Sequence, residues 1–415
     1  MSTDRTDVCI VGAGLAGLAC ARYLTRSGIE TLILEASDGV GGRIRTDVID
    51  GFRLDRGFQV LLTQYPEPHH QLRIDDLELC RFEPGALVRV RGKFHHVSDP
   101  LRRPSTILDT LRAPVGTIAD KARLAALILD LRRTTPRELL RRPDRSTADE
   151  LRARGFSATM VDTFWRPLFA GIQLDPELEV SSRRFTLILS MLAEGDAAVP
   201  AQGMGAIPAQ MAADLPHGTV TLDARVASIT ADGVALTDGR RITARAVIVA
   251  TEGPTAAELL GLRDPGSRPV SALQFGADEA PIPDRLVVLD GDGTGPASNL
   301  AVMTNIAPGY APPGRALISV EVPGPLVPDD GDLLEAVRTQ LRGWFGGAVD
   351  SWTHLRTLRI AHGHPDQRPG FSPKQAIRVG DRRYVCGDHR DTASIQGALY
   401  SGRRAASVVL ADLRR

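Results

Sequence analysis

The chain has 415 residues, and its 50 lysines and arginines balance its 50 aspartates and glutamates. Hydrophobic residues make up 43% of it and charged residues 24%, which is typical of a soluble globular protein. The balanced charge argues against nucleic acid or another polyanion as a partner. No apolar run reaches the ~18 residues that suggest a transmembrane helix, and the length favours two domains.

The N-terminal segment carries the first informative pattern. The apolar run 8–11 predicts a buried strand, and Gly12, Gly14 and Gly17 follow it at G-x-G-x-x-G spacing before a predicted helix. The first glycine permits a tight turn, the second lets the backbone approach a pyrophosphate, and the third lets helix and strand pack closely. The residues between them are expected at the same site, where the helix start faces the phosphates: Ala13, Leu15 and Ala16.

An acidic residue ends the next apolar run, 31–34. Glu35 lies at roughly the offset of 20 residues at which a carboxylate hydrogen-bonds ribose hydroxyls, and Ala36 lies beside it. Strand, glycines, helix and acid together predict a dinucleotide-binding unit.

A second glycine pair indicates FAD rather than NAD. Gly41 and Gly42 expose the backbone, and Arg43 adds a donor fork suited to phosphate oxygens. With these residues the chain resembles the flavin-containing amine oxidase superfamily, nearest to its branch of phytoene and carotenoid desaturases and protoporphyrinogen oxidases. There this segment lies along the FAD diphosphate. The resemblance implies an FAD, which we expect to be non-covalent because no cysteine lies in a plausible attachment loop.

The next segments are assigned by the resemblance. Residues 51–60 match a stretch that passes the flavin face, which makes Gly57, Phe58 and Gln59 candidate cofactor residues; a core strand hairpin is the alternative. Val226, in a strand–turn–strand pattern, takes the place of a residue that contacts the adenine.

Residues 101–195 have a mainly helical pattern. Within them, 101–142 interleaves basic residues with leucines and isoleucines. We favour a helical lid with a solvated basic face, and peripheral contact with an anionic membrane is the alternative. Trp165, Phe169 and Met204 lie in segments that resemble the desaturase branch. They are candidate walls of an apolar substrate pocket, with plain core packing as the alternative.

The C-terminal part carries the resemblance again. Residues 383–388 read as a strand ending at Gly387 and Asp388, and a capped helix is predicted from Ser394 onward. In the superfamily such an aspartate accepts from a ribityl or ribose hydroxyl, and N–H groups around Ile395 face the flavin pyrimidine. His389 is a candidate proton relay, with a surface turn as the alternative.

The resemblance implies an α/β fold with a discontinuous, Rossmann-like FAD-binding domain over 1–62, 215–262 and 352–415. A mixed α+β substrate domain with a helical insert is expected over 63–214 and 263–351. No catalytic residue is assigned beyond the candidates His389 and Gln59. Histidine pairs lack carboxylates or cysteines at ligand spacing, so no metal is expected. Four scattered cysteines predict reduced thiols and a cytoplasmic protein, with membrane association as the alternative above.

Two departures from the amine-oxidase branch bear on the substrate. The strand 271–276 lacks the lysine that bonds through water to the flavin there, and Ser394 replaces a tyrosine of the aromatic cage. A single dinucleotide motif leaves no evident NADPH domain, so electrons are expected to reach oxygen, a quinone or another acceptor. The sequence predicts hydride removal from an apolar small molecule by desaturase-like C–C dehydrogenation. Amine oxidation and a non-redox isomerase or carrier are the alternatives.

Overall fold

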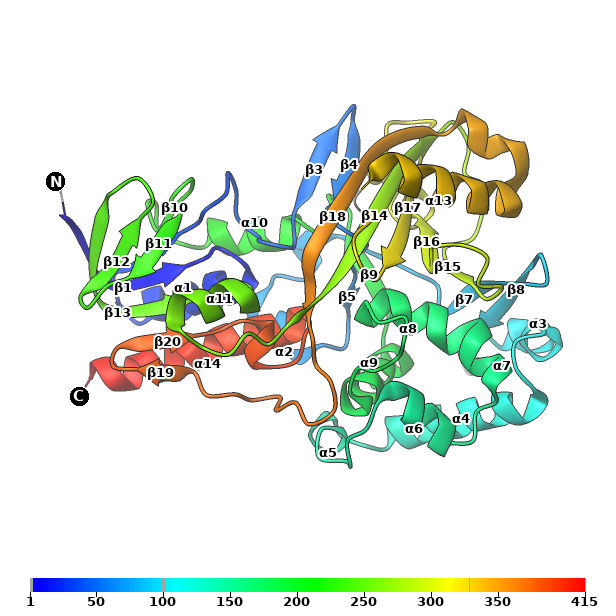
Figure 1. Cartoon of the computed structure of the whole chain (residues 1–415), viewed down its shortest axis with the longest axis horizontal. Coiled ribbons are helices and arrows are strands. Elements are labelled where there is room, and N and C mark those ends of the chain that lie inside the picture. Colours follow the sequence, from blue (N-terminus) through cyan, green and yellow to red (C-terminus); the bar gives the residue numbers. More distant parts are fainter. Residues whose placement is uncertain (1–2, 99–101, 328, 415) are drawn as a thin grey trace.

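The protein is described from a computed structural model, which describes residues 3–98, 102–327 and 329–414. Figure 1 shows a sheet with its helices and both chain ends at one end of the molecule. A second sheet and a cluster of helices lie at the other end. Two long strands, β14 (Ser267–Ala277) and β18 (Thr353–Pro365), run between the two ends (Figure 1).

The first sheet is the predicted Rossmann-like unit. Its strand order is β10-β2-β1-β13-β12-β11, and β20 pairs with β13. β1 (Thr3–Val11) is parallel to both β2 (Thr31–Leu34) and β13 (Arg241–Val249), and β20 (Arg383–Val385) is parallel to β13. The remaining strands are short: β10 (Val220–Thr221), β11 (Val226–Ile229), β12 (Gly233–Leu236) and β19 (Arg378–Gly380).

Two helices from opposite ends of the sequence pack together on this sheet: α1 (Leu15–Arg26) and α14 (Ile395–Leu413). Because Gly402 has no side chain, α14 approaches α1 so closely that an added Cβ would lie 2.2 Å from the Ala16 oxygen. A third helix, α11 (Gly253–Leu260), follows β13 (Figure 1). The glycine and alanine pattern of both long helices thus serves close packing, which brings the N-terminal and C-terminal motifs together.

The second sheet has the order β18-β14-β17-β16-β15-β7-β8. Its other strands are β17 (Ala316–Pro323), β16 (Asn299–Val302), β15 (Val287–Asp290), β7 (Gly85–Val90) and β8 (Lys93–Ser98). Helix α13 (Asp330–Phe345) covers one face and buries Leu333, Val337 and Leu341 there. The expected boundary at residue 352 is wrong, since β18 pairs with β14 and the chain rejoins the first sheet only at β19.

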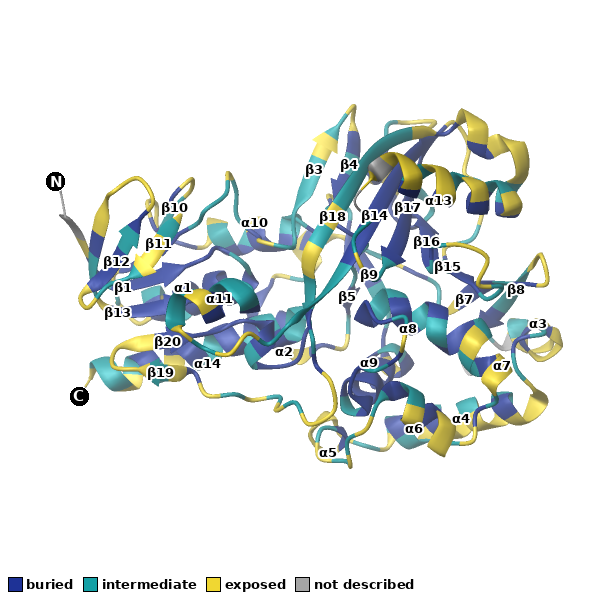
Figure 2. Cartoon of the chain, in the orientation of Figure 1, coloured by how far each residue is buried: buried dark blue, intermediate teal, exposed yellow. Residues whose placement is uncertain are grey.

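The helical insert is present and follows β8 of the second sheet in the chain. Its helices are α3 (Ile107–Arg112), α4 (Ile118–Arg132), α5 (Pro136–Leu139), α6 (Thr147–Ala153), α7 (Ala158–Met160), α8 (Arg166–Gln173) and α9 (Ser182–Glu194). A π-helical turn, Val161–Trp165, precedes α8. Figure 2 shows exposed residues along the outer sides of α4 and α6.

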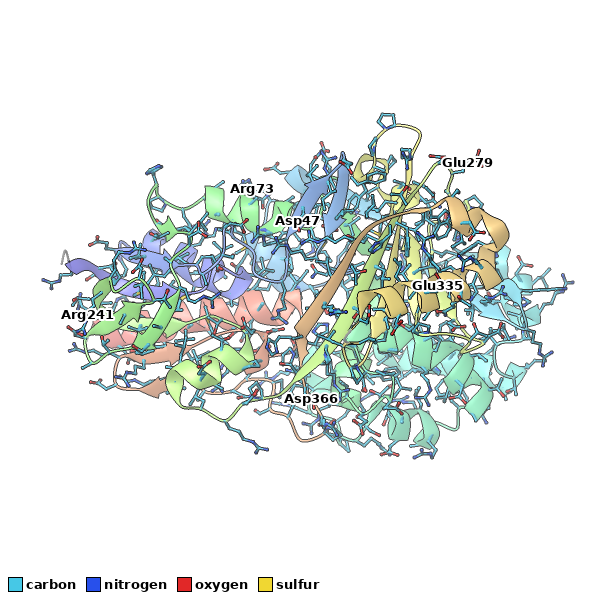
Figure 3. All side chains as sticks on the ribbon, turned by 45° about the horizontal axis from the view of Figure 1, so that its top comes forward. Asp47, Arg73, Arg241, Glu279, Glu335 and Asp366 are labelled. Atoms are coloured by element: carbon cyan, nitrogen blue, oxygen red, sulfur yellow. The ribbon has the colours of Figure 1, made fainter. Side chains whose placement is uncertain are left out.

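Small elements connect the two ends of the molecule. They are β3 (Thr46–Ile49), β4 (Phe52–Asp55), β5 (Leu61–Leu62), β6 (Leu79–Arg81), β9 (Ala197–Pro200), α2 (Pro66–Gln71), α10 (Ala206–Ala213) and α12 (Met303–Ile306). Asp47 on β3, labelled in Figure 3, forms ion pairs with Arg56 and with Arg356 of β18. Within the described ranges, no helix is long and apolar enough to span a bilayer.

Candidate cofactor and substrate site

One continuous cavity of about 1070 Å³ runs from the glycine motif of the first sheet into the helical insert. Pockets for a single small ligand usually measure ~300–1,000 Å³. The cavity exceeds that range, and its walls come from both sheets and from the insert. It therefore has room for a cofactor at one end and a substrate at the other.

The three glycines of the first motif differ in their surroundings. Gly12 has φ +105°, a conformation that L side chains rarely adopt. At Gly17 an added Cβ would lie 2.0 Å from the Gly12 oxygen, so helix α1 can pack on β1 only with glycine there. At Gly14, which lines the cavity, an added Cβ would meet no atom within 4 Å. The open space over Gly14 at the start of α1 is a cradle of the kind that a pyrophosphate needs.

Glu35 is held in place at the carboxyl end of β2. Its Oε2 accepts from the Ala13 N–H (2.8 Å), and its Oε1 accepts from the Ser37 N–H (2.9 Å) and hydroxyl (2.8 Å). The carboxylate lines the cavity, and lone pairs remain on its oxygens for further donors. It is fixed where a ribose next to the pyrophosphate cradle would present its hydroxyls.

Arg43 and Asp388 form an ion pair across the cavity wall. Arg43 Nη2 donates to Asp388 Oδ1 (2.6 Å), and Nη1 donates to the carbonyl oxygen of Gly363 (2.8 Å). Burial raises the pKa of Asp388, but the Arg43 charge beside it outweighs burial and leaves that pKa below its ordinary value. The residues that the sequence analysis assigned to a phosphate and to a ribityl hydroxyl therefore contact each other.

The segment after the β3–β4 hairpin turns along the cavity. Gly57 has φ +94°, and the Gln59 amide Nε2 donates to the carbonyl oxygens of Arg43 (2.8 Å) and Arg56 (3.1 Å). The Gln59 Oε1 is left buried without a partner among the described residues. A buried acceptor of this kind calls for a donor. Together with the Gly14 cradle it fits a flavin dinucleotide, whose ring carries N–H groups.

Most of the predicted cofactor residues line this cavity: Gly12, Gly14, Leu15, Ala16, Glu35, Ala36, Gly42, Arg43, Gly57, Phe58, Gln59, Val226, Gly387, Asp388, Ser394 and Ile395. Ala13 and Gly17 do not. Ala13 instead positions the wall, because its N–H holds Glu35 and its carbonyl accepts from Gly41. Ser394 caps α14 by accepting from the Gly397 N–H (3.0 Å).

The predicted substrate wall needs correction. Trp165 lines the cavity, whereas Phe169 and Met204 are absent from its lining. Phe169 is buried behind the wall, with its ring against those of Trp165 and Phe185. Met204 is buried in the core near the first sheet, where its N–H donates to Asp55 Oδ1. Both are core residues, which was the alternative interpretation.

His389 is neither at the cavity nor on the surface. Its side chain is buried, both ring nitrogens lack partners among the described residues, and it does not line the cavity. Burial lowers the pKa of His389 to about 4, so the ring is neutral at neutral pH. The structure gives it no access to a substrate, which argues against a proton-relay role.

One acidic side chain and one amide side chain of the second sheet reach the cavity, and the sequence analysis missed both. Glu321 on β17 is 2% exposed and accepts from the Phe58 N–H (2.6 Å). Burial raises the pKa of Glu321 to about 8. Asn299 on the neighbouring β16 has a buried Oδ1 without a partner among the described residues. A single carboxylate in the apolar run 316–322 was a visible signal for Glu321.

A histidine and an arginine were missed as well. His364 of β18 lines the cavity, and burial together with the charges of Arg184 and Arg43 holds its pKa well below the ordinary value. Arg184, near the start of α9, lines the cavity with its side chain almost fully buried. Nothing in the local pattern around either residue distinguishes it from a surface position.

The far end of the cavity reaches the surface through the insert. Four of its lining residues on α3 and α4 are exposed large hydrophobics: Ile107, Leu111, Ile118 and Leu129. Lys121 also lines this end, and its Nζ donates to the carbonyl oxygens of Leu111 and Ala113. Strand β14 contains the segment that the sequence analysis compared with the lysine-bearing strand of amine oxidases. Val270 is the only residue of β14 that lines the cavity.

Comparison with known proteins identifies the family of this chain. The sequence model described as flavin containing amine oxidoreductase matches residues 15–410. A putative flavin-containing monoamine oxidase of Mycobacterium tuberculosis is 55% identical over 51 residues, which are 12% of this chain and 11% of that relative. A zeta-carotene-forming phytoene desaturase of Myxococcus xanthus is 34% identical over 99 residues, 22% of this chain and 19% of that relative. Each match spans only a small part of the relative.

Solved structures share the fold over their whole length. An oxidoreductase from Methanosarcina mazei has a TM-score of 0.74 at 20% identity, with 99% of this chain and 100% of that chain covered. A putative protoporphyrinogen oxidase from Exiguobacterium has a TM-score of 0.71 at 18% identity, and cyclohexylamine oxidase from Brevibacterium oxydans has 0.72 at 18%, with the same coverage. These likenesses confirm the expected fold. Because the family model covers nearly all of the chain, the protein belongs to the flavin containing amine oxidoreductase family and is an FAD-dependent oxidoreductase.

Proposed function

We propose that the protein dehydrogenates a carbon–carbon bond of an apolar small molecule by removing a hydride and a proton. FAD supplies the hydride acceptor, and the electrons pass on to oxygen, a quinone or another acceptor. The observation that carries the proposal is the apolar lining between Trp165 and the surface. Aliphatic and aromatic side chains from the insert dominate it, including Val115, Leu124, Ile128, Phe164, Leu168, Ile172, Ile188 and Leu189.

The residues around the glycine motif would hold the cofactor. Glu35 would bind ribose hydroxyls, and the N–H groups at the start of α1, together with Arg43, would bind the diphosphate. Asp388 keeps Arg43 in place and would accept from a hydroxyl of the cofactor. None of the four cysteines lines the cavity, which supports non-covalent FAD.

Dehydrogenation also releases a proton, and Glu321 is our candidate for its acceptor. Its carboxyl group lies in the cavity wall next to Phe58, in the segment that we assign to the flavin face. With a pKa of about 8, a fraction of the Glu321 carboxyl groups is ionised near neutral pH, and this ionised form can accept the proton. The Gln59 amide does not titrate, so its part is to accept a hydrogen bond through Oε1.

Amine oxidation is the second candidate, and Glu321 is the observation that favours it. A substrate ammonium group beside Glu321 would favour the ionised form of its carboxyl group, which would then accept from that cation. Against it stands the cavity lining, which is mostly apolar around Trp165 and has Ser394 at the start of α14.

The mouth of the cavity supports contact with a membrane or another lipid store. Most exposed large hydrophobics of the described residues lie on α3 and α4: Ile107, Leu108, Leu111, Ile118 and Leu129. Basic residues alternate with them, as in helices that lie on anionic bilayers. The segment proposed for this contact is 101–142, of which residue 101 lies outside the described residues. Binding to anionic vesicles, compared with neutral ones, tests this part separately.

The decisive experiment measures flavin reduction without oxygen. The purified holoprotein is mixed anaerobically with polyenes, porphyrinogens and simple primary amines, and bleaching of the flavin absorption is followed. We expect a polyene or another apolar compound to reduce the flavin faster than any simple amine. Fast reduction by a simple amine with inert polyenes would reverse the order of the two candidates.

A further inference from the structure

The guanidinium group of Arg184 is a buried cation with unused donors. Its side chain is 1% exposed and lines the cavity beside Ala393, Ser394 and Ile395. Nη2 donates to the Ala393 carbonyl oxygen (3.0 Å), whereas Nε and Nη1 are buried without a partner among the described residues. Unlike the unpartnered Gln59 Oε1 and the unpartnered ring nitrogens of His389, these two donors belong to a charged group.

No described carboxylate neutralises this cation. Tyr65, Asp388 and Asp175 contribute to its electrostatic surroundings. Burial raises the pKa of Tyr65 to about 12 and keeps it neutral, while Asp388 is paired with Arg43 and Asp175 with Arg268. Burial lowers the pKa of Arg184 to about 10, which still leaves it charged at neutral pH. Burying a charge without a counter-charge costs free energy. A buried, unpaired cation beside a cavity therefore indicates that an anion binds in the cavity.

We propose that Arg184 binds a delocalised anionic oxygen group inside the cavity. One source of such a group is the carboxylate of an otherwise apolar substrate, and the other is the flavin pyrimidine, whose oxygens and N1 share negative charge on reduction. The planar guanidinium suits either one. Binding of a substrate carboxylate rests on the proposed function. It would orient the substrate with its anionic end at Arg184 and its apolar body in the insert.

Binding of small probes to the holoprotein tests the first source. Decanoate, decanol and decylamine are titrated, and the change in the visible absorption of the flavin is followed. We expect decanoate to bind tighter than decanol by roughly 10- to 100-fold, the range for a buried charge-assisted contact. Arg184→Met should abolish this preference and Arg184→Lys should reduce it. Arg183→Met is the matched control, because Arg183 directly precedes Arg184 in α9 and does not line the cavity.

The midpoint potential of the flavin tests the second source. If Arg184 faces the pyrimidine, Arg184→Met lowers the potential, Arg184→Lys lowers it less, and decanoate shows no preference over decanol. Equal binding of decanoate and decanol to the wild type, with an unchanged potential in Arg184→Met, would overturn the proposal. If Arg184→Met does not fold, Arg184→Lys replaces it; because lysine lacks the planar pair of donors, an unchanged potential in Arg184→Lys together with equal binding of decanoate and decanol to the wild type would overturn the proposal as well. The proposed function fails on a different result, namely that no apolar compound reduces the flavin.

Discussion

Glu321 offers the sharpest test of the electrostatics of the cavity, because one substitution removes its titration and keeps its shape. In Glu321→Gln the side-chain oxygen can still accept from the Phe58 N–H, as the carboxyl does now at 2.6 Å. The glutamine cannot ionise. Any difference in pH dependence between the two proteins therefore reports the proton on Glu321.

The sign follows from the raised pKa. The folded protein holds this proton up to about pH 8, whereas the ordinary value is 4.5, so between these values the folded state binds more protons than the unfolded state. Wild-type stability is then lost as pH rises from ~5 to ~8, by about 1.4 kcal/mol per unit, or on the order of 4 kcal/mol in all. The glutamine variant lacks this loss. Its stability relative to the wild type should rise by that amount over the same range.

Chemical denaturation of both proteins at intervals from pH 5 to 8.5 measures the difference. The exposed Glu279, labelled in Figure 3, provides the control Glu279→Gln, whose profile should run parallel to the wild type. If the Glu321→Gln profile also ran parallel to the wild type, Glu321 would not hold a proton in the folded state. Our assignment of it as a proton acceptor near neutral pH would then be wrong.

Three further predictions concern the cofactor end. Glu35→Ala and Arg43→Ala should each weaken FAD binding by roughly 10- to 100-fold, since each removes contacts worth about 1.5–3 kcal/mol; equilibrium titration of the apoprotein measures this, and unchanged affinity in both would mean that the site is misplaced. Acid precipitation should release all yellow colour into the supernatant, and flavin left in the pellet would contradict non-covalent binding. Gly14→Ala should fold normally and bind FAD poorly, because its methyl group would point into open space at the cradle. Gly17→Ala should instead lower stability by at least ~1–3 kcal/mol in denaturation, because its methyl group would meet the Gly12 oxygen at 2.0 Å; equal stability of the two variants would refute this.

Features within short stretches could be predicted from the sequence. The run 8–11 with Gly12, Gly14 and Gly17 predicted strand, turn and helix, because backbone conformation and close packing depend on residues a few positions apart. Ser394 as the cap of α14 is equally local. The family resemblance, confirmed by the family model, added the cofactor and the meeting of the two chain ends.

Only the tertiary structure decided which side chains reach the cavity. Phe169 and Trp165 share one helical segment, yet Trp165 lies in the wall and Phe169 behind it. Strand β18 was assigned to the wrong domain because pairing with β14 is a long-range backbone interaction that leaves no periodic signal. The sequence by itself determined the dinucleotide-binding unit through local backbone requirements. The burial that leaves Glu321 protonated and Arg184 without a counter-charge arises from packing between distant segments, so only the folded chain reveals it.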